Sequence, residues 1–105
     1  MLFIETPLFT KLIPEYLSDE EYAELQQVLL FRPETGKVIP GSGGLRKIRW
    51  AVDRQGKRGG LRVIYYWVTA DEQIYMLFLY KKNEQEELTH DQLKLLRRLV
   101  QEYLA

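Results

Sequence analysis

The chain has 105 residues, 46% of them hydrophobic and 29% charged, and its formal net charge is zero. This length favours a single domain over residues 1–105, and the composition is that of a soluble globular protein. The absence of cysteine excludes disulfides, a thiol nucleophile and thiolate metal sites. The N-terminus lacks the basic region of a signal peptide, and no apolar run approaches the roughly 20 residues of a membrane span. We therefore expect a cytoplasmic protein.

The first predicted elements are a short strand and a short helix. The apolar run Leu2–Glu5 has the length and composition of a strand. Thr6 then offers an N-cap and Pro7 a first helical position, so the pattern predicts a helix over residues 7–13. Pro14 is expected to end this helix, because proline cannot donate the next backbone hydrogen bond.

A second helix is marked more clearly. Ser18 and Glu21 have the spacing of a capping box. Apolar residues then recur at helical spacing until Arg32-Pro33 breaks the pattern: Tyr22, Leu25, Val28 and Leu29. The connection that follows holds a short extended piece at 37–39. Its glycine-rich turn at 41–44 lacks the spacing of a phosphate-binding loop and indicates a tight entry into the next strand.

Three strand-like segments come next, at residues 45–52, 61–69 and 73–82, and are rich in Val, Ile, Tyr, Trp and Phe. The order and short connectors predict an antiparallel meander. Thr89 is the predicted N-cap of a final amphipathic helix. The predicted fold class is α+β: a small antiparallel β-sheet with N-terminal helices and a C-terminal helix packed on one of its faces.

Charge is segregated along the chain. The segment from Lys37 to Arg62 holds eight cations against one anion, Asp53, whereas residues 15–24 and 84–91 are acidic. The eight cations are Lys37, Arg46, Lys47, Arg49, Arg54, Lys57, Arg58 and Arg62. A half-buried sheet does not need this excess to fold, so the sequence predicts a polyanion as partner. The structural alternative is a solvated sheet face whose cations discourage edge aggregation.

Strand alternation divides these cations between two faces. Lys47 and Arg49 share a face with Leu45. These two cations are separated by about 7 Å along the strand, which suits the binding of one phosphate or two adjacent ones. Arg46 points to the opposite face, which we expect to meet the core. Arg62 begins the next strand and is expected to be exposed, so its replacement by Ala would change stability by less than about 1 kcal/mol.

The available residue types limit the chemistry. His90 is the single histidine and is expected at the surface, and no metal-binding motif or cofactor site is found. Lysine and arginine can nonetheless cleave RNA, because the nucleophile is then the 2′-OH of the substrate. A lysine would hold or accept the 2′-OH proton, and an arginine would stabilise the charge on the phosphate.

Three segments of the chain, GGLRKIRWA, GKRGGLRVIYYW and LYKKNEQEELT, resemble the HigB-type toxins of the RelE/ParE superfamily. The resemblance implies the toxin of a type II toxin–antitoxin system, a ribosome-dependent endoribonuclease that cuts mRNA in the A site. Its expected partners are mRNA, the ribosome and a cognate antitoxin, a helix-turn-helix protein in the HigA manner. The implied catalytic residues are Lys47, Arg49, Arg62 and Lys82. The expected RNA-binding residues are Arg54, Lys57, Arg58 and Asn83.

The resemblance also leaves questions open. Where RelE has an arginine followed at a distance by a catalytic tyrosine, this chain has Asn83 and Thr89, so the tyrosine role is unassigned. Two alternatives remain, a ParE-like inhibitor of DNA gyrase and a non-catalytic module that binds RNA or the ribosome. The strand Leu2–Glu5 would offer an edge for strand addition by the antitoxin, although we expect it to be fully paired within its own sheet.

Overall fold

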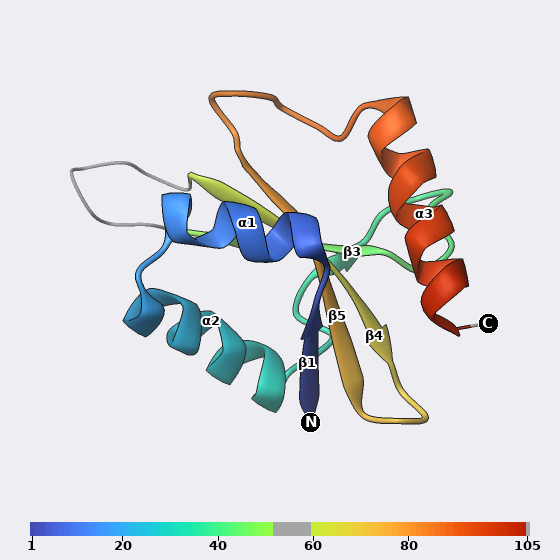
Figure 1. The fold of residues 1–105 in the computed structure, drawn as a ribbon, viewed down its shortest axis with the longest axis horizontal. Coiled ribbons are helices and arrows are strands. Elements are labelled where there is room, and N and C mark those ends of the chain that lie inside the picture. Colours follow the sequence, from blue (N-terminus) through green and yellow to red (C-terminus); the bar gives the residue numbers. More distant parts are fainter. Residues whose placement is uncertain (52–59, 105) are drawn as a thin grey trace.

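The computed structural model of the chain describes residues 1–51 and 60–104 (Figure 1). The elements in chain order are β1 (Leu2–Glu5), α1 (Pro7–Tyr16), α2 (Asp19–Phe31), β2 (Lys37–Val38), β3 (Arg46–Trp50), β4 (Leu61–Val68), β5 (Gln73–Lys81) and α3 (His90–Leu104). The α+β class is confirmed, and the predicted bounds of the strands and helices hold to within a few residues.

The described strands form one sheet in the order β1-β5-β4-β3-β2. The predicted antiparallel meander of β3, β4 and β5 is confirmed, and β2 adds an antiparallel partner to β3. The sheet is mixed, however, because β1 pairs with β5 in parallel. Parallel neighbours need a long connection, and the whole chain from α1 to β4 supplies it. The expectation that β1 is paired on both sides is wrong for the described residues, since β1 lies at one edge of the sheet.

Helices cover both faces of the sheet rather than one, which corrects the sequence-based expectation. Val63 of β4 packs in a cluster with Phe9 of α1 and Leu25 of α2, whereas the next residue, Ile64, packs in a second cluster with Leu96 of α3. The physical reason is that β4 and β5 are apolar on both faces, so each face needs a cover. Figure 1 shows α1 and α2 on one side of the sheet and α3 on the other.

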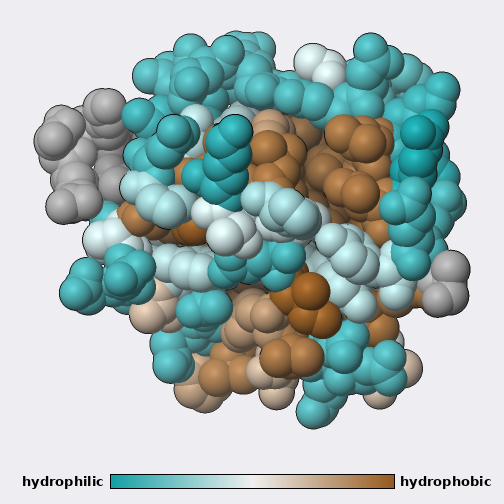
Figure 2. All heavy atoms as spheres, viewed as in Figure 1, coloured by the Kyte–Doolittle hydropathy of each residue, from teal (hydrophilic) through white to brown (hydrophobic). Residues whose placement is uncertain are grey.

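Hydrophilic side chains form the outer border of this arrangement. Figure 2 shows them along α3 and along the segment that joins β5 to α3, and apolar side chains gather between α1 and α3. In the described part of the chain, no helix combines the length and the apolar character needed to cross a membrane.

The predicted helix starts are confirmed. The Thr6 hydroxyl accepts a hydrogen bond from the Phe9 N–H at 3.0 Å and donates one to the Leu77 carbonyl at 2.8 Å, which ties the start of α1 to β5. Ser18 and Glu21 form the reciprocal capping box at the start of α2, with distances of 3.1 and 2.8 Å. Each cap satisfies backbone donors that a helix leaves open at its first turn.

The end of α1 differs from the prediction. Pro14 lies inside the helix, which continues to Tyr16. Proline removes one backbone hydrogen bond, but Ile13 is buried beside it and the carbonyl of Ile13 accepts a hydrogen bond from the N–H of Leu17. Burial of the apolar side of the last turn therefore offsets the lost bond.

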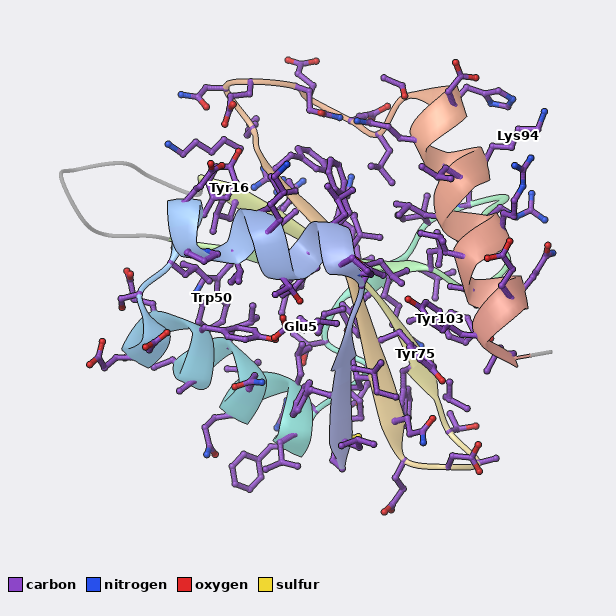
Figure 3. All side chains as sticks on the ribbon, viewed as in Figure 1. Glu5, Tyr16, Trp50, Tyr75, Lys94 and Tyr103 are labelled. Carbon is purple, nitrogen blue, oxygen red and sulfur yellow. The ribbon has the colours of Figure 1, made fainter. Side chains whose placement is uncertain are left out.

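A polar contact fastens the two N-terminal helices to the edge strand. The carboxylate of Glu5 in β1 accepts hydrogen bonds from Thr10 of α1 at 2.6 Å and from the hydroxyl of Tyr22 in α2 at 2.8 Å. Burial, followed by the hydrogen bond that the Tyr22 hydroxyl donates to Glu5, raises the pKa of Tyr22 well above its usual range. Figure 3 shows Glu5 near both helices, and Trp50 of β3 lies between α1 and α2.

Candidate functional site

A pocket of about 850 Å³ lies at the β2 side of the sheet. Its described lining comes from β2, β3, the end of β5 and the segment that leads into α3. Three cations, one carboxylate and one phenol face it: Lys37, Lys47, Arg49, Glu87 and Tyr80. Apolar side chains such as Ile39, Leu88 and Leu93 complete the wall. A concave site with a few convergent polar groups has the usual form of a ligand site.

Strand register places like charges directly opposite one another. Lys37 of β2 pairs with Lys47 of β3, and Arg49 of β3 pairs with Arg62 of β4. Directly opposite side chains share a sheet face, with Cβ atoms roughly 5 Å apart, and like charges in this position destabilise the sheet. Two pairs of cations therefore lie close together in this part of the sheet, and their positive charge suits the binding of an anion.

The predicted partition of cations between faces is confirmed. Leu45 packs in the same apolar cluster as Leu96 of α3, which we call the α3 cluster. Lys47 and Arg49 therefore point to the sheet face that α3 covers, where they line the pocket. Arg46 points the other way. Its guanidinium lies 5.9 Å from the centroid of Trp67 and donates to the carbonyl of Gly36 at 2.8 Å, which is a structural role.

Hydrogen bonds to the side chain of Tyr65 hold the loop before β2 in place. The hydroxyl of Tyr65, whose side chain is fully buried in β4, donates to the carbonyl of Pro33 at 2.6 Å and accepts from the N–H of Gly36 at 2.8 Å. A Cβ atom on Gly36 would lie 2.7 Å from the Tyr65 ring, so only glycine fits this close approach. These contacts fix the backbone next to Lys37 and hence one side of the pocket.

Arg62 differs from its predicted state. Only 5% of its surface is exposed, because β4 is a central strand with neighbours on both sides. Arg49 and Tyr80 lie directly across from it on these two neighbours. The prediction that Arg62 is an exposed strand cation is therefore wrong, and the small effect on stability expected from that exposure loses its basis. Its position next to two pocket residues still adds positive charge beside the pocket.

Tyr80 is a pocket residue that the sequence analysis missed. The side chain is 3% exposed, and its hydroxyl has no hydrogen-bond partner within the described structure. Burial raises its pKa, the cation of Arg62 lowers it and the carboxylate of Glu87 raises it. The sequence alone shows a tyrosine near the end of an apolar strand. Only the cross-strand register shows that it meets Arg62.

Glu87 is the second residue that the sequence analysis missed, because it falls in a segment interpreted only as an acidic flank. It is the one carboxylate among the described pocket-lining residues. Its segment is held by Gln85, which donates to the Glu87 carbonyl at 2.9 Å and to the side-chain oxygen of Gln92 at 2.8 Å. The predicted N-cap is confirmed, since the Thr89 hydroxyl accepts from the N–H of Gln92 at 3.1 Å. Thr89 is therefore engaged in starting α3.

The remaining predicted site residues lie elsewhere. Lys82 and Asn83 are exposed, directly after β5, and neither lines the pocket in the described structure. The backbone N–H of Lys82 donates to the carbonyl of Gly60 at 2.8 Å, which places Lys82 at the same sheet end as Arg62. Three predicted RNA-binding residues fall outside the described residues: Arg54, Lys57 and Arg58. Within the ranges 1–51 and 60–104, no group of three side chains is placed to hold a metal ion.

Comparison with known proteins assigns the family. The model of the RelE toxin of the RelE/RelB toxin–antitoxin system matches residues 34–105, which include every pocket-lining residue. The chain belongs to the RelE toxin family. A solved structure of a mutant E. coli RelE toxin in the free state matches with a TM-score of 0.52 and 14% identity. The match covers 81% of this chain and 86% of that chain, and it supports the RelE fold.

Family membership makes this chain a toxin of a toxin–antitoxin system. The pocket unites two of the cations that the resemblance singled out, Lys47 and Arg49, with Arg62 beside them. It adds Lys37, Tyr80 and Glu87, which no motif of the sequence identified.

Proposed function

We propose that this RelE-family toxin is a ribosome-dependent endoribonuclease of the HigB type, which cuts mRNA in the A site. The observation that carries the proposal is the pocket in which Lys37, Lys47 and Arg49 converge, with like charges opposite one another across the strands. Such a concentration of positive charge in a concave site suits the phosphate of a nucleic acid.

The pocket supplies the groups that RNA cleavage requires. The 2′-oxygen of the substrate bonds to phosphorus, the bond to the 5′-oxygen breaks, and a 2′,3′-cyclic phosphate and a 5′-hydroxyl result. Lys47 and Arg49 hold the phosphate and stabilise its charge as it builds up. Glu87 receives the 2′-OH proton, because a carboxylate has acceptor atoms and an ammonium group has none.

Basic and polar residues that do not line the pocket bind the flanking RNA in this proposal. Lys82 and Asn83 are exposed at the end of β5, where they can contact backbone phosphates. The cations of the 54–58 segment take the same role. Buried Arg62 contributes charge from the sheet rather than direct contact with solvent. The proposed partner that blocks this surface is a HigA-like helix-turn-helix antitoxin.

The test uses purified toxin and ribosomes carrying a defined mRNA with an empty A site. We expect wild type to cut the message, with cuts mapped by primer extension, and Lys47→Ala and Arg49→Ala to lower the rate about 100-fold or more. Lys94→Ala is the matched control, because Lys94 is exposed and points outward from α3 (Figure 3). Arg62→Ala is a poor probe, since a buried side chain affects folding as well.

Three results would contradict the proposal. Growth arrest by the wild type with intact mRNA would exclude the nuclease activity. Loss of DNA supercoiling under the same conditions would point to gyrase as the target. Co-sedimentation with ribosomes in the absence of any cleavage would indicate a binding module.

A further inference from the structure

The hydroxyl of Tyr80 is a buried donor that the described residues leave without a hydrogen-bond partner. Its side chain is 3% exposed, and no hydrogen-bond partner for the hydroxyl exists among the described residues. Buried polar atoms are nearly always paired, because leaving one unpaired costs free energy. An unpaired buried hydroxyl therefore needs an explanation. One explanation is that it forms a hydrogen bond with a substrate.

Three other tyrosines that are buried or partly buried make hydrogen bonds with their hydroxyls. The Tyr65 hydroxyl bonds to two backbone groups, that of Tyr22 bonds to Glu5, and that of Tyr75 bonds to a neighbouring side chain, Gln73, at 3.3 Å. The unpaired state of Tyr80 is therefore not a general feature of tyrosines in this fold. It occurs at the tyrosine that lines the cationic pocket.

The surroundings of Tyr80 suit an anionic ligand with acceptor oxygens. Lys47 and Arg49 line the same pocket, and Arg62 lies directly across from Tyr80 on β4. The ring lies 5.9 Å from that of Phe78, centroid to centroid, and is packed in the α3 cluster. A raised pKa keeps the phenol protonated at neutral pH, so the hydroxyl can act as a donor.

We propose that Tyr80 is a catalytic residue whose hydroxyl donates a hydrogen bond to a non-bridging oxygen of the scissile RNA phosphate. This proposal rests on the proposed nuclease function and adds a residue to it. The side chain is held by packing in the α3 cluster before substrate arrives, so the donor needs little reorganisation when charge builds up on the phosphate. Tyr80 forms no covalent bond and keeps its proton throughout. The 2′-OH proton goes to Glu87, and the 5′-oxygen is protonated by solvent.

The experiment compares Tyr80→Phe with Tyr75→Phe on ribosomes programmed with a defined mRNA. Both substitutions remove only a hydroxyl from a buried tyrosine that packs in the α3 cluster, but Tyr75 does not line the pocket. Single-turnover rates at saturating toxin report the reaction. Affinity is measured separately on a message whose cleavage-site nucleotide is 2′-deoxy and cannot react. Thermal unfolding of each variant reports stability.

We expect Tyr80→Phe to lower the single-turnover rate about 100-fold, which is typical for the loss of one donor to a developing charge. Its affinity for the unreactive complex should change less than threefold. Its melting temperature should be equal to or above that of wild type, because the hydroxyl makes no hydrogen bond to the described residues. Tyr75→Phe should cleave at the wild-type rate.

The outcomes separate this proposal from the one on which it rests. If the wild type cleaves the message and Tyr80→Phe cleaves it at the same rate, the proposed role of Tyr80 is overturned and the nuclease function is left intact. A slower rate that is fully explained by a lower melting temperature or by weaker ribosome binding also overturns it. No cleavage by the wild type overturns both proposals, and in that case the unreactive message would show whether ribosome binding remains.

Discussion

Gly36→Ala tests how the fold fixes one wall of the pocket. A Cβ atom at this position would lie 2.7 Å from Cε1 and 2.8 Å from the hydroxyl oxygen of Tyr65, and 3.1 Å from the backbone carbon of Lys47. Tyr65 is fully buried and cannot swing toward solvent. The substitution therefore forces either the ring or the loop before β2 to move.

The magnitude follows from two contributions. Overpacking of a tightly filled site costs about 1–3 kcal/mol. Displacement of the loop also weakens the hydrogen bonds that Tyr65 makes to Pro33 and Gly36, at about 0.5–1.5 kcal/mol each. We expect a loss of about 2–6 kcal/mol in the free energy of unfolding, a large part of the roughly 5–15 kcal/mol of a typical domain.

Urea unfolding at equilibrium measures this loss as a lower midpoint at unchanged slope. Gly60→Ala is the control, since a Cβ atom there meets no atom within 4 Å. That variant should be unchanged or more stable by up to about 1 kcal/mol. In a Tyr65→Phe background the cost of Gly36→Ala should fall, because one of the clashing atoms is gone. A midpoint for Gly36→Ala that matches that of Gly60→Ala would refute the reasoning.

Glu87→Gln should lower the single-turnover cleavage rate about 100-fold with little change in stability, because the amide cannot take the 2′-OH proton; an unchanged rate would exclude Glu87 as the proton acceptor. Inorganic phosphate should raise the melting temperature, by the equivalent of about 1.4 kcal/mol at ten times its Kd. The effect should shrink in Lys47→Ala, and sodium chloride at equal ionic strength is the control. Thr89→Ala should cost about 0.5–2 kcal/mol by removing the N-cap of α3, and cleavage by the folded variant should continue; a folded but inactive variant would give Thr89 a role in the reaction.

Local signals in the sequence predicted most of the secondary structure. Ser18 and Glu21 marked the start of α2, and Thr89 marked that of α3, because capping involves atoms only three residues apart. Local signals failed at Pro14, where burial of the neighbouring Ile13 keeps the helix going. They also failed to show that both faces of the sheet are covered, because the helices that cover each face come from distant parts of the chain.

The charge pattern and strand alternation predicted the cationic part of the site. They placed Lys47 and Arg49 on one face, since alternation is a property of the strand itself. They did not place Arg62 correctly, because its burial depends on which strands lie beside β4. Exposure of a strand residue is decided by neighbours that a single segment does not reveal.

The amino-acid sequence by itself determined the elements, the family and the sign of the charge at the site. Only the tertiary structure decided which side chains meet there. Tyr80 is opposite Arg62 because of the register of β5 against β4, and Glu87 reaches the pocket because the segment before α3 returns over the sheet. Both relations join residues that are distant in the chain, and pairing of this kind is set by the packing of the whole sheet and not by any local pattern.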